Sequence, residues 1–416
     1  MNISKLTSIL LCSILAGVTI PSKVNSLEET VEAEHAQKST KFVERGLMYL
    51  KLEDDERAFS ECNKAIEVNP SDANAYFCRG VSYQRQQKHE RALSDLTRAL
   101  QLNPEDFDVL LARANIYAAK SRDNLAIAEY NKIIELQPKF ARAYYDRANF
   151  YAEKEQWLLA LLDYAKTIEL YKLTFLPSKL DRLDIELGLA VAHNNRGIVY
   201  QDRQQYSLAI ADYTEAIALV PKYPNPYVNR GGVYNRQGKH DLAIADLSLA
   251  LELNPNLAGA YYNRGLAYFK QEKYERALQD ANLAIEIDPN LYEPYILRGK
   301  LYDRQNKSKA AIADLNRAIE LNSHESYGYN NRGVIYLKHD KFDLALSDFE
   351  RAIEIDPQNA EAYGNRGLVH LKLKQPDIAR ADLQKARQLF KESGDLDSAE
   401  KLTGLLQRFF PQNRSQ

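Results

Sequence analysis

Small and apolar residues recur along most of this chain at a spacing of 34 residues. Repeats begin at residues 39, 73, 107 and 141 and, after a break, at residues 190, 224, 258, 292, 326 and 360. Positions 4, 8 and 11 of each repeat fall on one face of a helix with 3.6 residues per turn. Ala at positions 20 and 27 marks a second helix, which Pro near position 32 ends. The pattern therefore predicts ten helical hairpins.

Three positions of the repeat are nearly uniform. Position 8 is Gly or Ala, position 11 is Tyr in every repeat except the last, which has His370, and position 20 is Ala throughout. Gly inside a helix costs about 1 kcal/mol of helix propensity, so its recurrence predicts that another backbone comes close there. Each hairpin keeps packing faces that it cannot bury alone, and only stacking of the repeats covers them.

These residues resemble the tetratricopeptide repeat family from Ser39 to about Ser393. The Arg that precedes the packing Gly or Ala is similar to the Arg-Gly subtype of that family. The resemblance implies an all-α fold, a right-handed α-solenoid or superhelix of antiparallel helix pairs with a 34-residue period. It also implies that the first helices of the pairs line a concave groove.

Two charged positions accompany the packing pattern in all ten repeats. Position 7 is Arg and position 23 is Asp or Glu, as in Arg264 and Asp280. A planar guanidinium satisfies a carboxylate with two parallel hydrogen bonds. We expect a salt bridge between the two helices, within a repeat or across to the next, with a structural role.

The N-terminal residues 1–26 read as a signal peptide. Lys5 is followed by 15 largely apolar residues, and Pro21 ends the run. The run is short for a membrane span of about 20 residues, so cleavage is favoured over an uncleaved anchor. Export to a periplasm, a lumen or the exterior follows, and residues 27–38 are assigned to an N-terminal linker.

The repeats form two groups. Residues 39–174 hold repeats 1–4, and residues 190–393 hold repeats 5–10. Between them, residues 175–189 predict a loop around Pro177 and then an extension of the first helix of repeat 5. This insertion acts as a hinge or as a contact surface. Residues 394–416 predict a capping helix and a tail, because Leu and Ala recur there at helical spacing.

Two cysteines, Cys62 and Cys78, remain beyond the signal peptide. The favoured interpretation is two small buried residues on adjacent helices, with a disulfide as the alternative in an exported protein. Their spacing matches no zinc motif, and no phosphate loop, nucleophile elbow or metal-binding His pair is present. We therefore expect a non-enzymatic protein without a metal or a cofactor.

The face of the first helices opposite the packing Gly offers the candidate binding residues. Asn recurs at position 6 and a basic residue at position 13, which gives Asn195, Asn229, Asn263, Asn331 and Asn365 beside Arg236, Lys270, Arg304, Lys338 and Lys372. An amide donates and accepts, so a row of Asn matches an extended peptide backbone. The basic row favours acidic side chains or a free carboxylate. The alternative is that both rows are soluble residues on an exposed helix face.

The formal net charge of −2 provides no basic field for nucleic acid. The first hypothesis is an exported protein–protein interaction scaffold that binds extended peptides in its groove. The second is an assembly factor or holding chaperone for subunits of a membrane or photosynthetic complex, a role familiar for Arg-Gly repeat proteins. A third is a purely structural oligomer, and the sequence does not identify the partner.

Overall fold

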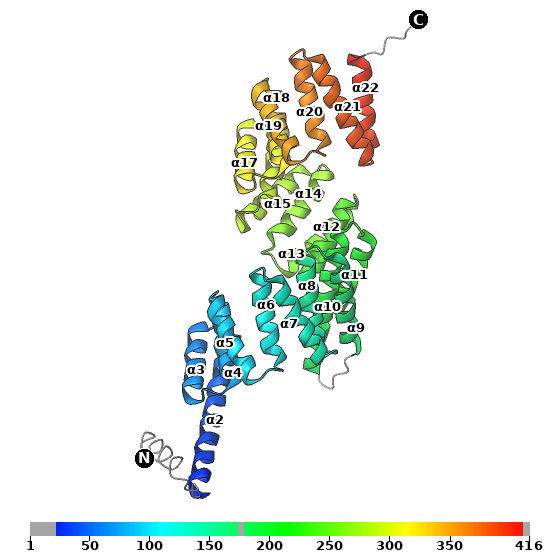
Figure 1. Ribbon diagram of the computed structural model, residues 1–416. Helices are drawn as coiled ribbons and strands as arrows, with labels where there is room; N and C mark the ends of the chain where they lie inside the picture. Colours follow the sequence, from blue (N-terminus) through cyan, green and yellow to red (C-terminus); the bar gives the residue numbers. More distant parts are fainter. Residues whose placement is uncertain (1–21, 174–178, 411–416) are drawn as a thin grey trace. The chain divides into compact units, whose positions relative to one another are not determined.

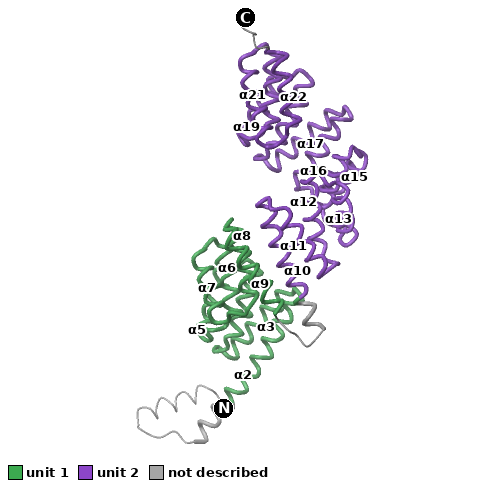
Figure 2. Tube along the Cα trace, turned by 90° about the vertical axis from the view of Figure 1, so that its right-hand side faces the viewer, with its two compact units in different colours: residues 1–185 green, residues 186–416 purple. Residues whose placement is uncertain are grey.

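The computed structural model describes residues 22–173 and 179–410, where it contains 21 helices and no strand (Figure 1). The helices group into two compact units, residues 1–185 and 186–416 (Figure 2). Residues 1–21, most of the predicted signal peptide, lie outside the described residues, as do Pro177 and the C-terminal tail. The prediction of an all-α repeat protein is confirmed.

The first unit contains repeats 1–4. Its helices are α2 (Ser22–Lys51), α3 (Asp55–Val68), α4 (Ala73–Arg85), α5 (His89–Leu102), α6 (Phe107–Ala119), α7 (Asp123–Leu136), α8 (Ala141–Glu153) and α9 (Trp157–Leu173). Residues 27–38, the predicted linker, have helical backbone because α2 begins far upstream of the first repeat.

The second unit contains repeats 5–10, and the boundary between the units falls inside α10 (Lys179–Asp202), which begins upstream of residue 190. The helices that follow are α11 (Tyr206–Leu219), α12 (Pro224–Arg236), α13 (His240–Leu253), α14 (Ala258–Lys270), α15 (Tyr274–Ile287), α16 (Glu293–Arg304), α17 (Ser308–Leu321), α18 (Ser326–Lys338), α19 (Phe342–Ile355), α20 (Ala360–Lys372), α21 (Pro376–Glu392) and α22 (Leu396–Phe409).

Each repeat is a hairpin of two packed helices, and its second helix packs on the first helix of the next repeat. The first helices also contact one another in sequence, as α12, α14, α16, α18 and α20 do in the second unit. They therefore form the inner row of each unit. The last helix, α22, packs on α21 and buries Ala399 and Leu406.

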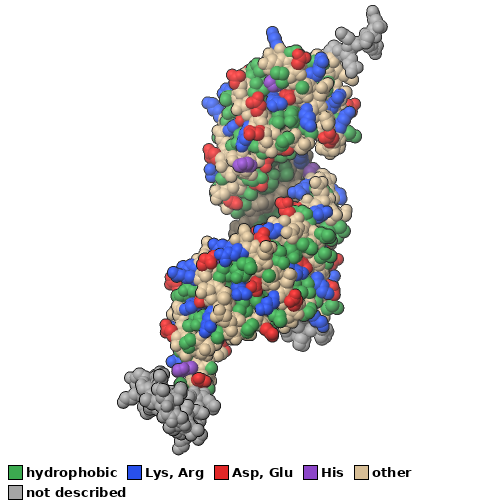
Figure 3. Space-filling model, in the orientation of Figure 1, with side chains coloured by type: hydrophobic (Ala, Val, Ile, Leu, Met, Phe, Trp, Pro, Cys, Tyr) green, Lys and Arg blue, Asp and Glu red, His purple; other side chains and the backbone are tan. Residues whose placement is uncertain are grey.

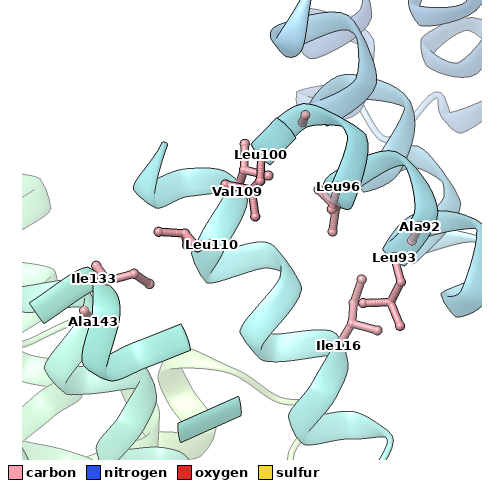
Figure 4. Close-up of a cluster of buried hydrophobic side chains, with 10 residues drawn as sticks. Ala92, Leu93, Leu96, Leu100, Val109, Leu110, Ile116, Ile133 and Ala143 are labelled. Atoms are coloured by element: carbon pink, nitrogen blue, oxygen red, sulfur yellow. The ribbon is translucent and has the colours of Figure 1, made fainter. Parts of the chain in front are cut away.

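The apolar core continues from one repeat to the next. In Figure 4, Leu96 and Leu100 of α5 lie with Val109 and Ile116 of α6 in one buried cluster, to which Ile133 of α7 also belongs. These helices belong to repeats 2 and 3, so neither hairpin encloses the cluster alone. Burial of such side chains supplies roughly 25 cal/mol per Å² of apolar surface.

The packing Gly at position 8 accommodates a side chain rather than the backbone that the sequence suggested. A Cβ on Gly333 would lie 2.7 Å from the ring of Phe349, and one on Gly231 would lie 2.8 Å from Leu247. Both neighbours occupy position 24 of the same hairpin. The carbonyl of position 20 is farther away, 3.4 Å at Gly299, where Ala311 supplies it.

The predicted salt bridges form in all ten repeats, and each lies within one hairpin. Both Nε and Nη2 of Arg264 donate to Asp280, at 2.9 Å each. In seven repeats the same guanidinium also donates to a polar side chain at position 25 of the preceding repeat, as Arg264 does to Ser248 at 3.1 Å. The sequence analysis missed this third bond, which joins consecutive repeats.

Cys62 of α3 and Cys78 of α4 are joined by a disulfide, with 5.7 Å between their Cα atoms. The favoured interpretation of two unpaired cysteines is therefore wrong, although both residues are fully buried on adjacent helices as expected. The two sulfur atoms lie over Gly46 of α2, where a Cβ would approach them to 2.6 and 2.8 Å. Absence of a side chain on α2 thus makes room for the bridge.

The turn between the two helices of every repeat adopts the same left-handed conformation at position 15. In repeat 7, the N–H of Glu272 donates to the carbonyl of Phe269 and the N–H of Lys273 to that of Tyr268, at 3.0 and 2.9 Å. This is a Schellman C-cap, which usually places Gly at the left-handed residue. Only Gly238 is Gly here, and the other nine positions carry side chains at positive φ.

We predict that reduction of the disulfide destabilises the first two repeats by about 3 kcal/mol, since the bridge closes a loop of 16 residues. Hydrogen exchange of α3 and α4, with and without a reductant, measures the effect. The double variant Cys62→Ala/Cys78→Ala is the control, because reductant should leave it unchanged. Equal protection of α3 and α4 in the oxidised and reduced protein would contradict the prediction.

We predict that Glu272→Gly raises stability by roughly 0.5–1 kcal/mol. It relieves a left-handed φ of 60°, and this gain exceeds the entropy that Gly adds to the unfolded chain. Urea unfolding measures the change. Glu275→Gly, in the exposed first turn of α15, is the matched control and should destabilise by about 1 kcal/mol. Loss of stability in both variants would refute the prediction.

Candidate functional site

The inner row of first helices in the second unit carries two adjoining hollows. One, of about 480 Å³, lies against α12 and α14, and Asn229, Asn263 and Lys270 are among its lining residues. The other, of about 740 Å³, reaches from Asn195 of α10 to the end of α15. Val228, Asn229, Gly259 and Leu291 line both hollows, so the two are continuous.

The predicted Asn residues at position 6 are half-buried between neighbouring first helices. Nδ2 of Asn229 donates to Oδ1 of Asn194 at 2.9 Å, and Nδ2 of Asn365 donates to Oδ1 of Asn330 at 3.0 Å. Each acceptor occupies position 5 of the preceding repeat. These two amides therefore hold repeats together and are not simply soluble groups on an exposed face.

Asn263 and Asn331 have no such partner, because position 5 of the preceding repeat is Val228 or Ile296. Among the described residues, the Asn263 side-chain amide makes no hydrogen bond. Nδ2 of Asn331 is buried and has no hydrogen-bond partner there. A buried amide donor without a partner is costly, so these two amides differ from Asn229 and Asn365 in having donors to offer.

The predicted basic row at position 13 is exposed, but part of it already has partners. Nζ of Lys338 lies 2.5 Å from Oδ2 of Asp303 in the preceding repeat. The Arg304 guanidinium stacks on the ring of Tyr274, 4.2 Å from its centre. Arg236 and Lys270 line the smaller hollow, whereas Lys372 lies exposed on α20.

Lys300 is a candidate residue that the sequence analysis missed. It stands at position 9 of α16, and the same position in the other repeats of the second unit is apolar or Gly: Ile198, Gly232, Leu266, Val334 and Leu368. Burial lowers the pKa of the Lys300 ammonium, Glu361 opposes that decrease, and Lys270 adds to it. One cation in an apolar row was the available signal, and a search for uniform rows overlooks it.

Tyr262 and Glu293 add polar groups to the floor of the smaller hollow. Burial raises the pKa of Tyr262 to about 12, and the nearby carboxylate of Glu293 adds to the rise. The phenol is therefore a neutral donor at physiological pH. Oε2 of Glu293 is buried and accepts no hydrogen bond within the described residues. The hollow thus offers both donors and acceptors above an apolar floor.

Charge on the surface follows no single sign. Figure 3 shows Lys and Arg side chains interspersed with Asp and Glu on the visible face of both units. The described residues contain no group of three or more side chains able to hold a metal ion. None of the helices in the described ranges combines the length and apolar character needed to cross a bilayer.

Family models match the repeats directly. Models described as tetratricopeptide repeat match residues 42–72, 73–106, 107–140, 258–291, 292–325, 326–359 and 349–381, and a model described as TPR repeat matches residues 197–238 and 231–272. Together they cover more than half of the chain. A comparison with curated proteins finds no match.

Solved structures with similar folds include three repeat proteins. YrrB, described as a TPR protein with an unusual peptide-binding site, is 26% identical over 46% of this chain and 97% of its own, with a TM-score of 0.34. Yeast Tom70 is 18% identical over 89% and 96%, with a TM-score of 0.40. A tetratricopeptide repeat protein from Parabacteroides merdae is 22% identical over 64% and 98%, with a TM-score of 0.47.

We predict that Arg264→Ala lowers stability by about 2–3 kcal/mol, whereas Lys270→Ala changes it by less than about 0.5 kcal/mol. The first change leaves the Asp280 carboxylate, only 5% exposed, without its cation. The second removes an exposed side chain for which the described residues provide no ion pair. Thermal unfolding compares them, and equal losses would show that position 7 has no special structural role.

Proposed function

Because this chain belongs to the tetratricopeptide repeat family, we propose that it is a non-enzymatic scaffold that binds extended peptide segments of other proteins. The observation that carries the proposal is the pair of continuous hollows on the inner helices of repeats 5–7. None of the matched family models describes a catalytic domain, which supports a role in recognition.

The chemistry of the hollows matches a peptide backbone. Asn263 provides an amide, Tyr262 a neutral phenol and Glu293 an unpaired carboxylate oxygen, while Val228 and Leu266 supply apolar contact. A main chain presents N–H and C=O groups alternately, so it needs acceptors and donors together. The remaining exposed cation of the smaller hollow besides Arg236 is Lys270, which favours an acidic partner.

A holding chaperone or assembly factor is the second candidate function. It is favoured by exposed apolar side chains on α9, where Leu158 is 70% and Leu162 is 59% exposed. Clustered exposed leucines suit contact with incompletely folded chains. Binding of unfolded polypeptide that survives blocking of the inner hollows would favour this function over the peptide-binding scaffold.

The proposed setting is an exported compartment, on the basis of the apolar N-terminal sequence up to Pro21. A buried disulfide between Cys62 and Cys78 suits an oxidising compartment and so agrees with export. The Arg at position 7 beside Gly or Ala supports assignment to the Arg-Gly subtype.

We predict that Gly232→Phe reduces peptide capture at least tenfold and leaves the fold intact. A Cβ at Gly232 meets no atom within 4 Å, and the residue lines the smaller hollow, so the ring would fill the space where a peptide binds. Selection of random 12-residue peptides on immobilised full-length protein provides the probe, and titration of the selected peptides measures affinity.

Gly404→Phe is the matched control, because Gly404 also lies in a helix with open space around its Cβ but stands on α22, outside the hollows. Circular dichroism verifies that both variants keep their helix content. Failure of the wild-type chain to select any peptide, or equal capture by both variants, would refute peptide binding in the hollows.

A further inference from the structure

A third hollow, of about 180 Å³, lies farther along the inner row, between α16 and α18. Its apolar lining includes Phe269, Val334 and Ile335. Two side chains in this lining are hydrogen-bond donors with no hydrogen-bond partner among the described residues, Lys300 of α16 and Asn331 of α18. They occupy positions 9 and 6 of consecutive repeats, so the stacking of the repeats brings them together.

Lys300 is a mostly buried cation that lacks an ion pair. No carboxylate in the described residues lies within salt-bridge distance of its ammonium, although Glu361 exerts a favourable field at longer range. That carboxylate also accepts a hydrogen bond from Nδ2 of Asn330, at 3.2 Å. Desolvation lowers the pKa of Lys300, as expected for a cation with too few partners.

Asn331 adds a neutral donor beside this cation. Its Nδ2 is buried and makes no hydrogen bond, whereas the corresponding amides of Asn229 and Asn365 bind Asn residues of the preceding repeat. Ile296 occupies the preceding repeat's position here and offers no acceptor. Native proteins seldom leave such donors unsatisfied, so the amide awaits an acceptor from outside the chain.

The other charges at this hollow already have partners. Asp303 is neutralised by Lys338, and the guanidinium of Arg304 stacks on Tyr274. One uncompensated positive charge and one amide donor remain. An acceptor with a single negative charge and two oxygens satisfies both groups at once, since one oxygen takes the ammonium and the other the amide.

We propose that Lys300 and Asn331 form a subsite for one carboxylate of a bound polypeptide. The inference deepens the proposed function and rests on it, because it assigns a ligand group to one place on the same inner face. The group comes from the C-terminus of the ligand or from an Asp or Glu side chain. The apolar walls strengthen the interaction because they exclude water.

Three small probes test the subsite without a known peptide ligand. N-acetylglycine carries a carboxylate like that of a C-terminus, N-acetylaspartic acid α-amide carries one like a side chain, and N-acetylglycinamide carries none. Each is titrated into full-length protein labelled with carbon-13 at lysine. The nuclear magnetic resonance signal of the Lys300 side chain is assigned by its absence from Lys300→Met, which should fold because this position is elsewhere apolar.

We expect at least one carboxylate probe to shift the Lys300 signal saturably, and the neutral probe to have no saturable effect. The stronger acid identifies the source of the carboxylate. Asn331→Leu should weaken binding about tenfold, because it removes a hydrogen bond to a charged acceptor. Lys372→Met is the matched control, since this exposed lysine of α20 lies outside the hollow, and it should leave the binding unchanged.

The absence of any saturable shift with both acids would overturn the subsite, even when the 12-residue library yields peptides that bind elsewhere on the inner face. Equal, unsaturable shifts of the Lys300 and Lys372 signals would also overturn it, since they indicate general charge screening. Saturable binding of an acid by a chain that selects no peptide would support the subsite while refuting the proposed function.

Discussion

The guanidinium at position 7 is the interaction on which the array depends. In repeat 7, Arg264 binds Asp280 of its own hairpin through two hydrogen bonds and Ser248 of the preceding hairpin through a third. One side chain therefore sets the angle inside a hairpin and the fit to its neighbour. A rigid planar fork can serve three helices in this way, and a lysine ammonium cannot.

Stacking held in this way brings the first helices close together and determines which of their polar groups remain available. Where position 5 of one repeat is Asn, it takes up the amide at position 6 of the next, as Asn194 does for Asn229. Where position 5 is apolar, the amide has no partner within the chain. Two residues of the repeat thus decide between a structural amide and one that can bind a ligand.

The repeat pattern predicted the hairpins and all ten Arg–carboxylate pairs, because each is a regular consequence of one period. It did not predict the left-handed turns, since nine of the ten residues there, including Glu272, lack the usual Gly. It also placed position 6 on an open face, although Cys78 is fully buried there and Asn331 partly so. Curvature of the inner row brings these residues inward, and a flat helical projection does not represent curvature.

The candidate site was predictable only as far as it repeats. Asn and basic rows stand out in the sequence, yet Lys338 and Arg304 make contacts with the preceding repeat that no row reveals. Lys300 carries the opposite lesson, because it interrupts a row. In a repetitive chain, conformity to the period maintains the stack, and departures from it are where individual chemistry is found.

The cystine in repeats 1 and 2 gives the two ends of the array different kinetic characters. A terminal hairpin has a single neighbour, so a linear stack begins to fray at its extremities. The bridge between α3 and α4 ties the first hairpin covalently to the second, whereas α22 at the other extremity packs on α21 by noncovalent contacts alone. Unzipping, whether by heat, by protease or by a pulling force, therefore starts at the C-terminal end.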